Sequence, residues 1–122
     1  MISGKWIRGG CIAAFFFMAV TLFFGALEIG KINSVPHLLH RVEHFLYYGS
    51  MAFLLARGLG RRWFWIALLA VPLVGALDEW HQFYVPGRNS AVADWMVDAL
   101  GTVFAVYVYY RWTGFRESKE ER

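Results

Sequence analysis

Cysteine, proline and charged side chains are all scarce in this chain of 122 residues. Its single cysteine, Cys11, excludes an intramolecular disulfide and a four-cysteine zinc site. Charged residues make up 17% of the sequence, whereas 58% of the residues are hydrophobic and 19% are aromatic. Neither an internal repeat nor a low-complexity segment is present. These scarcities argue against a soluble, disulfide-bonded or zinc-finger domain, and the arrangement of the hydrophobic residues decides the class of protein.

The hydrophobic residues fall in four long blocks, not in the dispersed periodic pattern of a soluble domain. A helix needs about 20 apolar residues to cross the hydrocarbon core of a bilayer. The blocks lack the alternation of a barrel strand, and lipid accepts only helices and closed barrels. We therefore predict an all-α, polytopic membrane protein: one domain over residues 1–122 that forms an up-down bundle of four transmembrane helices. The predicted spans are residues 6–27, 36–59, 63–84 and 91–112, and a charged tail follows at 113–122.

The first block also has features of a secretory signal, because Lys5 and Arg8 precede it. However, its apolar stretch is long for a signal, and no A-x-A-like cleavage site follows it. We therefore interpret the block as a span that stays in the protein.

Basic residues are unevenly shared between the two ends of the predicted bundle. With four spans, both termini and the loop between the second and third spans lie on the same side. Nine Lys and Arg residues fall on that side, and only Lys31, Arg41 and Arg88 fall on the other. The positive-inside rule then places both termini in the cytoplasm. Because topology explains the net charge of +3, nucleic acid is not expected as a partner.

Acidic residues and histidines gather at the opposite, outer end. The residues concerned are Glu28, Glu43, Asp78, Glu79, Asp94, Asp98, His37, His40, His44 and His81. An ionisable side chain within the bilayer costs ~2.5–3.5 kcal/mol on insertion scales, so these groups should face the bundle interior and meet partners there. Pairs such as His40 with His44, or Asp94 with Asp98, share one helix face because they are four residues apart.

The link between the third and fourth spans is short, covering about residues 85–90. Its Pro86-Gly87 pair suits the central positions of a type II turn. So tight a hairpin makes the two spans antiparallel neighbours and brings their outer carboxylates together. Arg41 and Arg88 are the natural counter-charges for that cluster.

These patterns predict an outward-facing polar site built by the second, third and fourth spans. Its predicted members are Arg41, His44, Asp78, Glu79, Gln82, Arg88 and Asp94. Secondary positions are His40, Glu43, His81 and Asp98, while Pro86 and Gly87 shape the turn and Gly101 permits close helix packing.

Four of these residues are candidate metal ligands by type, namely His40, His44, Asp78 and His81. The spacing from His40 to His44 lacks the glutamate of the metalloprotease pattern. No cofactor is therefore predicted.

Two separated motifs resemble the VanZ-like family. The segment DEWHQFYVPGR at residues 78–88, followed by Asp94 and Gly101, resembles the signature of that family. Upstream, HRVEHF at residues 40–45, followed by Tyr48, is similar to its Asp-Lys-x-x-His-Phe element.

The resemblance implies a small helical protein of the bacterial cell envelope, in the cytoplasmic membrane. The founding member of the family is associated with resistance to the glycopeptide teicoplanin. Two departures separate this chain from the family pattern: His40 stands where the family often has Asp, and Asp98 where it often has Asn. No catalytic residue follows from the resemblance.

Several interpretations of the polar site stay open. It is either a structural network that ties the helices together or a site for an envelope lipid, a cell-wall precursor or a glycopeptide-like ligand, with a role of the antibiotic-resistance type. As alternatives, the chain is an accessory subunit of a larger membrane complex, or an enzyme that uses a metal or acid/base groups on a lipid-linked phosphate. The sequence leans against an enzyme. Besides the bilayer and the ligands and subunits given above, the sequence indicates no partner, and it does not identify the ligand.

Overall fold

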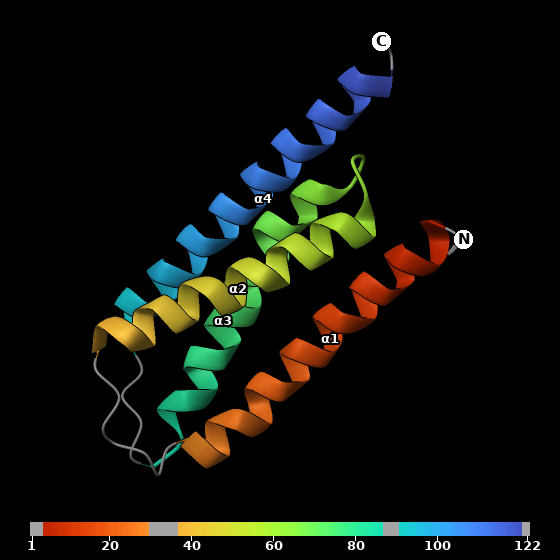
Figure 1. Ribbon diagram of the computed structural model, residues 1–122. Helices are drawn as coiled ribbons and strands as arrows, with labels where there is room; N and C mark the ends of the chain where they lie inside the picture. The colour runs from red at the N-terminus through yellow and green to blue at the C-terminus, as the bar shows by residue number, and fades with distance from the viewer. Residues whose placement is uncertain (1–3, 30–36, 87–90, 121–122) are drawn as a thin grey trace.

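A computed structural model describes residues 4–29, 37–86 and 91–120 of the chain (Figure 1). These residues form four α-helices and one short 3-10 helix. In chain order they are α1 (Gly4–Ile29), α2 (His37–Leu59), η1 (Phe64–Ile66), α3 (Ala67–Phe83) and α4 (Val92–Glu120). The predicted all-α class is confirmed. The fourth helix continues past residue 112, the predicted end of the fourth span, and most of the predicted charged tail is helical.

Three helical segments among the described residues are long and apolar enough to cross a membrane. They are Gly4–Phe24, Phe64–Phe83 and Val92–Lys119. Their large apolar side chains point outward, as lipid-facing residues do: Phe17 is 70% exposed and Leu69 is 66% exposed. The helix α2 is not among these three, because its polar residues lower its hydropathy. Three of the four predicted spans are thus found by length and composition.

The helix α2 lies across the middle of the molecule and contacts α1, α3 and α4 (Figure 1). The two described chain ends and the turn between α2 and η1 lie at one end of the molecule, and the start of α2, the end of α3 and the start of α4 lie at the other. The second of these ends carries Asp78, Glu79 and Asp94.

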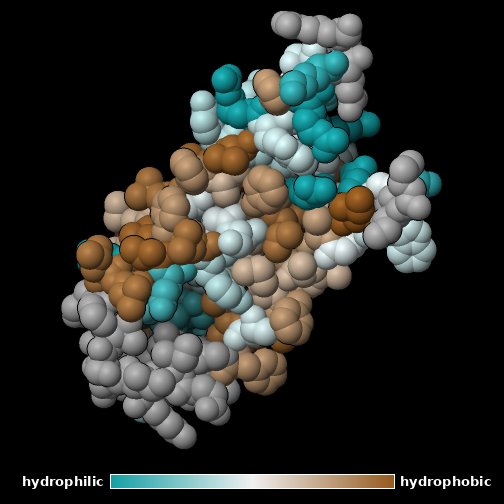
Figure 2. Space-filling model, viewed as in Figure 1, coloured by the Kyte–Doolittle hydropathy of each residue, from teal (hydrophilic) through white to brown (hydrophobic). Residues whose placement is uncertain are grey.

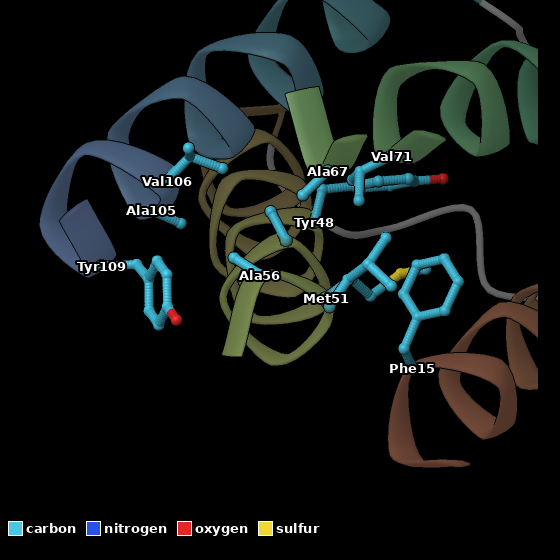
Figure 3. Packing of buried hydrophobic residues seen from close by; sticks show 11 residues of the cluster. Phe15, Tyr48, Met51, Ala56, Ala67, Val71, Ala105, Val106 and Tyr109 are labelled. Carbon is cyan, nitrogen blue, oxygen red and sulfur yellow. The ribbon is translucent and has the colours of Figure 1, made fainter. Parts of the chain in front are cut away.

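The helix α2 supplies five of the eleven buried apolar core residues, more than any other helix, and packs against all three neighbours (Figure 3). Its fully buried members include Met51, Ala52 and Ala56. Close approach of α2 and α4 depends on Gly101, because a Cβ added there would lie 2.5 Å from the Phe45 carbonyl oxygen. Small residues at such crossings allow backbones to touch, so this contact fixes α4 against α2.

The end that holds both described chain ends is rich in arginine and aromatic residues, and Figure 2 shows hydrophilic residues gathered there. Arg8 of α1 donates hydrogen bonds to the carbonyl oxygens of Gly58 and Leu59, at 2.9 and 2.7 Å. These carbonyls close α2, where a cation is favourable because of the helix dipole. Gly60, with a φ of 78°, then reverses the chain as a left-handed cap. We call this region the basic end.

Candidate functional site

The most deeply placed carboxylate belongs to Asp98 of α4, which is fully buried. Its Oδ1 lies 2.8 Å from Nδ1 of His44 on α2, within hydrogen-bond distance. Its Oδ2 has no hydrogen-bond partner among the described residues. Gly75 of α3 makes room for this oxygen, because a Cβ added at Gly75 would lie 3.1 Å from it. Three helices therefore enclose a carboxylate that is only half satisfied.

Asp78 of α3 is the second buried carboxylate, with 3% of its surface exposed. Its Oδ2 accepts hydrogen bonds from the Tyr48 hydroxyl at 3.0 Å and from Gln82 Nε2 at 2.8 Å. Its Oδ1 has no partner. Because Tyr48 comes from α2, one oxygen of Asp78 joins α2 to α3 while the other stays open.

Glu79 of α3 is half-buried and faces the start of α4. Its Oε2 accepts a hydrogen bond of 3.1 Å from the backbone N–H of Ala91. A carboxylate at the beginning of a helix is favourable, because the first N–H groups have no partner within the helix. Its Oε1, like the open oxygens of Asp78 and Asp98, has no partner.

Asp94, in the first turn of α4, pairs with side chains nearer the protein surface. It forms ion pairs of 3.7 Å with Arg41 Nε and with His40 Nε2. The Arg41 side chain is 52% exposed, so this pair lies at the rim and contributes little to stability.

The structure brings most of the predicted site residues together at one end of the molecule. The predicted residues that make the contacts above are His40, Arg41, His44, Asp78, Glu79, Gln82, Asp94 and Asp98. Among them Asp98, predicted as secondary, is the most buried. We call this group the acidic cluster.

Other predicted residues lie apart from the acidic cluster. Glu43 is exposed on α2. The ring of His81 packs on Phe23 of α1, with ring centroids 4.5 Å apart. Pro86 lies in an exposed turn, whereas Gly87 and Arg88 fall outside the described residues, so their predicted roles stay predictions. Among the other residues named in the sequence, the side chains of Glu28 and His37 also fall outside the description.

Two site residues were not predicted, Tyr48 and Trp95. Tyr48 is four residues after His44, so the spacing argument applied to His40 and His44 also places it on the same face. Trp95 of α4 donates its indole N–H to the carbonyl oxygen of Pro72, at 2.9 Å. Pro72 interrupts the hydrogen bonding of α3, and this contact is tertiary, so no local pattern reveals it.

Three members of the acidic cluster have the arrangement of a metal-ligand set. One possible ligand atom each from His44, Glu79 and Asp98 lies within 4.8 Å of the others. Of the four predicted ligand candidates, only His44 belongs to this group; Glu79 and Asp98 complete it.

A groove of about 450 Å³ lies between α1 and α3, beside the acidic cluster. Its wall is apolar along most of its length, and Asp78 and His81 supply its polar groups. His81 Nδ1, like Asp78 Oδ1, is buried without a hydrogen-bond partner. The lining residues are Phe16, Ala19, Val20, Leu22, Phe23, Phe24, Val74, Leu77, Asp78 and His81.

Comparison with known proteins gives one match. A family described as VanZ/LLP1 matches residues 10–113, a range that includes the acidic cluster and the groove. No curated protein and no solved structure matches the chain significantly.

Proposed function

The chain belongs to the VanZ/LLP1 family, and from that premise we propose that it binds an amphiphile of the bacterial cell envelope. The ligand is a membrane lipid or a lipid-linked cell-wall precursor. A glycopeptide-like ligand that carries an acyl chain has the same chemistry, and binding it would give the protein a role of the antibiotic-resistance type.

The observation that carries this proposal is the groove between α1 and α3. Its volume of about 450 Å³ is within the range of small-molecule sites, ~300–1,000 Å³. Eight of its ten lining residues are apolar, and the remaining two, Asp78 and His81, each have a buried polar atom without a partner. Such atoms are costly unless something bonds to them. An apolar chain fits this lining, and a hydroxyl or amide group on it would lie beside Asp78 and His81.

The groove is open to the side, which suits a ligand that arrives from the bilayer. Phe16 and Phe24 of α1 and Leu77 of α3 line it, and they are 60%, 66% and 45% exposed. Because α1 and α3 are apolar enough to cross the membrane, these exposed side chains would face acyl chains. A lipid could therefore enter without leaving the membrane.

We also propose that α2 is a fourth span and that the acidic cluster faces the outside of the cytoplasmic membrane. The 23 residues of α2 extend about 35 Å at ~1.5 Å per residue, which exceeds a hydrocarbon core of ~30 Å. It packs among three helices that include all the candidate spans. The excess of Lys and Arg at the basic end supports cytoplasmic termini.

Labelling of single cysteines tests this topology directly. In a Cys11→Ser background, Ser90→Cys should react with a membrane-impermeant maleimide on intact cells. Ser118→Cys, near the end of α4, should react only after the cells are opened. The reverse pattern would contradict the proposed orientation, and equal labelling of both positions would contradict a membrane crossing by α4.

Binding is tested by filling the groove. Ala19 lines it, whereas Ala13 of the same helix is exposed and does not. We expect Ala19→Phe to lower the affinity for a lipid with a photoreactive acyl chain by roughly tenfold, equivalent to about 1.4 kcal/mol. Ala13→Phe, the matched control, should bind like the wild type. Equal cross-linking of both variants, or cross-links spread over all lipid-facing helices, would overturn the proposal.

The two ligand sources are separated by competition. An unlabelled envelope lipid or lipid-linked precursor, and separately a glycopeptide with an acyl chain, are added during cross-linking. The competitor that lowers the yield in the wild type and not in Ala19→Phe identifies the source. Cells that carry the wild type should also survive the glycopeptide better than cells that carry Ala19→Phe if the glycopeptide is the ligand.

A further inference from the structure

The acidic cluster has unsatisfied carboxylate oxygens deep in the protein. Asp98 is fully buried, and its Oδ2 lacks a hydrogen-bond partner in the part of the chain that the structure describes. Glu79 Oε1 is also buried without a partner, while the other oxygen of Glu79 accepts from Ala91. Buried carboxylate oxygens are costly unless a cation or a donor meets them. The positions of these oxygens therefore point to a positively charged partner.

The described part of the chain does not supply that partner from Lys or Arg. No Lys or Arg among these residues forms an ion pair with Asp78, Glu79 or Asp98, and Arg41 pairs with Asp94 at the rim. Within the described residues, the imidazole of His44 is the one cationic or donor group that meets Asp98. Arg88 lies outside the described residues, so it enters the test below as a competing counter-charge.

The arrangement of His44, Glu79 and Asp98 fits an ion at their centre. One possible ligand atom from each lies within 4.8 Å of the others. Donors that share one zinc ion at ~2.0–2.2 Å lie roughly 3.4 Å apart when tetrahedral. A contraction on the order of 1 Å would close the set. The three residues come from α2, α3 and α4, so a shared ion would join the three helices.

We propose that His44, Glu79 and Asp98 bind one divalent transition-metal ion, zinc in the first place. One imidazole nitrogen and two carboxylate oxygens are ligands that suit zinc, and manganese is the next candidate by this donor set. Two carboxylates balance the charge of a divalent ion. Three protein donors also leave a coordination position open. This proposal does not depend on the amphiphile, because none of the three proposed metal ligands lines the groove.

Metal content is the direct test. The full chain is purified in detergent, stripped with a chelator, incubated with Zn²⁺ and passed through a desalting column before elemental analysis. We expect about one zinc per chain for the wild type. Asp98→Asn should lower zinc affinity on the order of 100-fold, because it removes a charged ligand and keeps the side-chain shape. Glu43→Gln is the matched control, since Glu43 is exposed on α2, and should bind like the wild type.

Two further measurements keep the test independent of folding. Titration with Co²⁺ should give visible absorption bands in the wild type that are lost in Glu79→Gln, a change at a half-buried position. Size-exclusion chromatography identifies any variant that is misfolded. The groove variant Ala19→Phe should keep full zinc binding, so failure of the metal site and failure of amphiphile binding remain distinguishable.

The proposal is overturned if the wild type holds neither zinc nor manganese stoichiometrically, or if Asp98→Asn and Glu79→Gln bind as tightly as the wild type. If the metal-free wild type binds no ion and Arg88→Gln alone destabilises the protein, Arg88 is the missing counter-charge and no metal site exists.

Discussion

The two ends of the molecule treat charge in opposite ways. At the basic end, the guanidinium groups of Arg57 and Arg116 each lie 5.2 Å from the centre of the Trp112 ring, and Arg61 pairs with Glu117 on the surface. At the opposite end (the acidic end), which holds the acidic cluster, Asp78 and Asp98 are buried, and each has one oxygen without a partner among residues 4–29, 37–86 and 91–120. Charge is exposed and partnered at one end, and buried and incompletely partnered at the other.

This difference shows that the two ends serve different needs. Arginines that rest on aromatic rings bury their stems, keep their charge hydrated and suit a membrane interface. The proposed topology is enough to explain their arrangement. Buried oxygens without partners lower stability, so topology does not explain them. A ligand or an ion that completes their bonding does, which is why both proposals concern the acidic end.

Among the changes that test this difference between the two ends, Gly101→Leu is expected to cause the largest loss of stability. It blocks the packing of α4 against α2 that holds the acidic end together. A Cβ at Gly101 would already lie 2.5 Å from a backbone oxygen of α2, so a longer side chain must push α4 away. We expect a loss of more than about 3 kcal/mol, or no folded protein. Thermal unfolding in detergent measures it.

The matched control for that change is Gly114→Leu, where an added Cβ meets nothing within 4 Å. It should unfold close to the wild-type temperature. If both variants are equally stable, the contact between α2 and α4 is not as close as described.

Tyr48→Phe comes next, because it removes one of two donors to a buried carboxylate. Hydrogen bonds to charged groups contribute about 1.5–3 kcal/mol, and we expect a loss in that range. Tyr107→Phe on the exposed face of α4 is the control and should be neutral. A neutral Tyr48→Phe would show that Asp78 does not depend on this donor.

A smaller loss, about 1 kcal/mol, is expected for Trp95→Phe. This change removes the hydrogen bond to the Pro72 carbonyl oxygen and keeps an aromatic ring. Trp80→Phe, exposed on α3, is the control. Equal unfolding temperatures for the two variants would mean that the contact with α3 adds nothing to stability.

The smallest effect belongs to the basic end. Arg61→Ala removes a surface ion pair with Glu117, and such exposed pairs are worth about 0–1 kcal/mol. Whatever loss is measured by thermal unfolding should shrink further in high salt. A loss as large as that of Tyr48→Phe would contradict the proposed difference between the two ends, because the basic end would then depend on its charges for stability.

Much of this arrangement could be predicted from the sequence, because lipid imposes strong rules. Long apolar blocks predicted the helices, and the helix-face spacing of Asp94 and Asp98 predicted that both point to the interior. The pairing of His44 with Asp98, rather than with Asp78 or Glu79, could not be predicted, because it depends on how far α4 slides along α2 at Gly101. The groove was not predicted either, since it depends on the distance between α1 and α3.

The end of α4 shows a second limit. Hydropathy marked a membrane boundary near Trp112, but a helix does not end where the membrane does. No proline follows, so hydrogen bonding continues to Glu120. The stop of a span and the stop of a helix are set by different forces.

We propose that the acidic cluster binds a ligand or an ion and does not stabilise the fold, and the unfolding temperature of metal-free Asp98→Asn distinguishes these two roles. The amide oxygen can still accept a hydrogen bond from His44, and the variant no longer places a charge in the interior. We therefore expect it to unfold at the wild-type temperature or above it. If the unfolding temperature falls by about 4 °C or more, roughly 1 kcal/mol for a domain of this size, the proposal is wrong and the acidic cluster is a structural network.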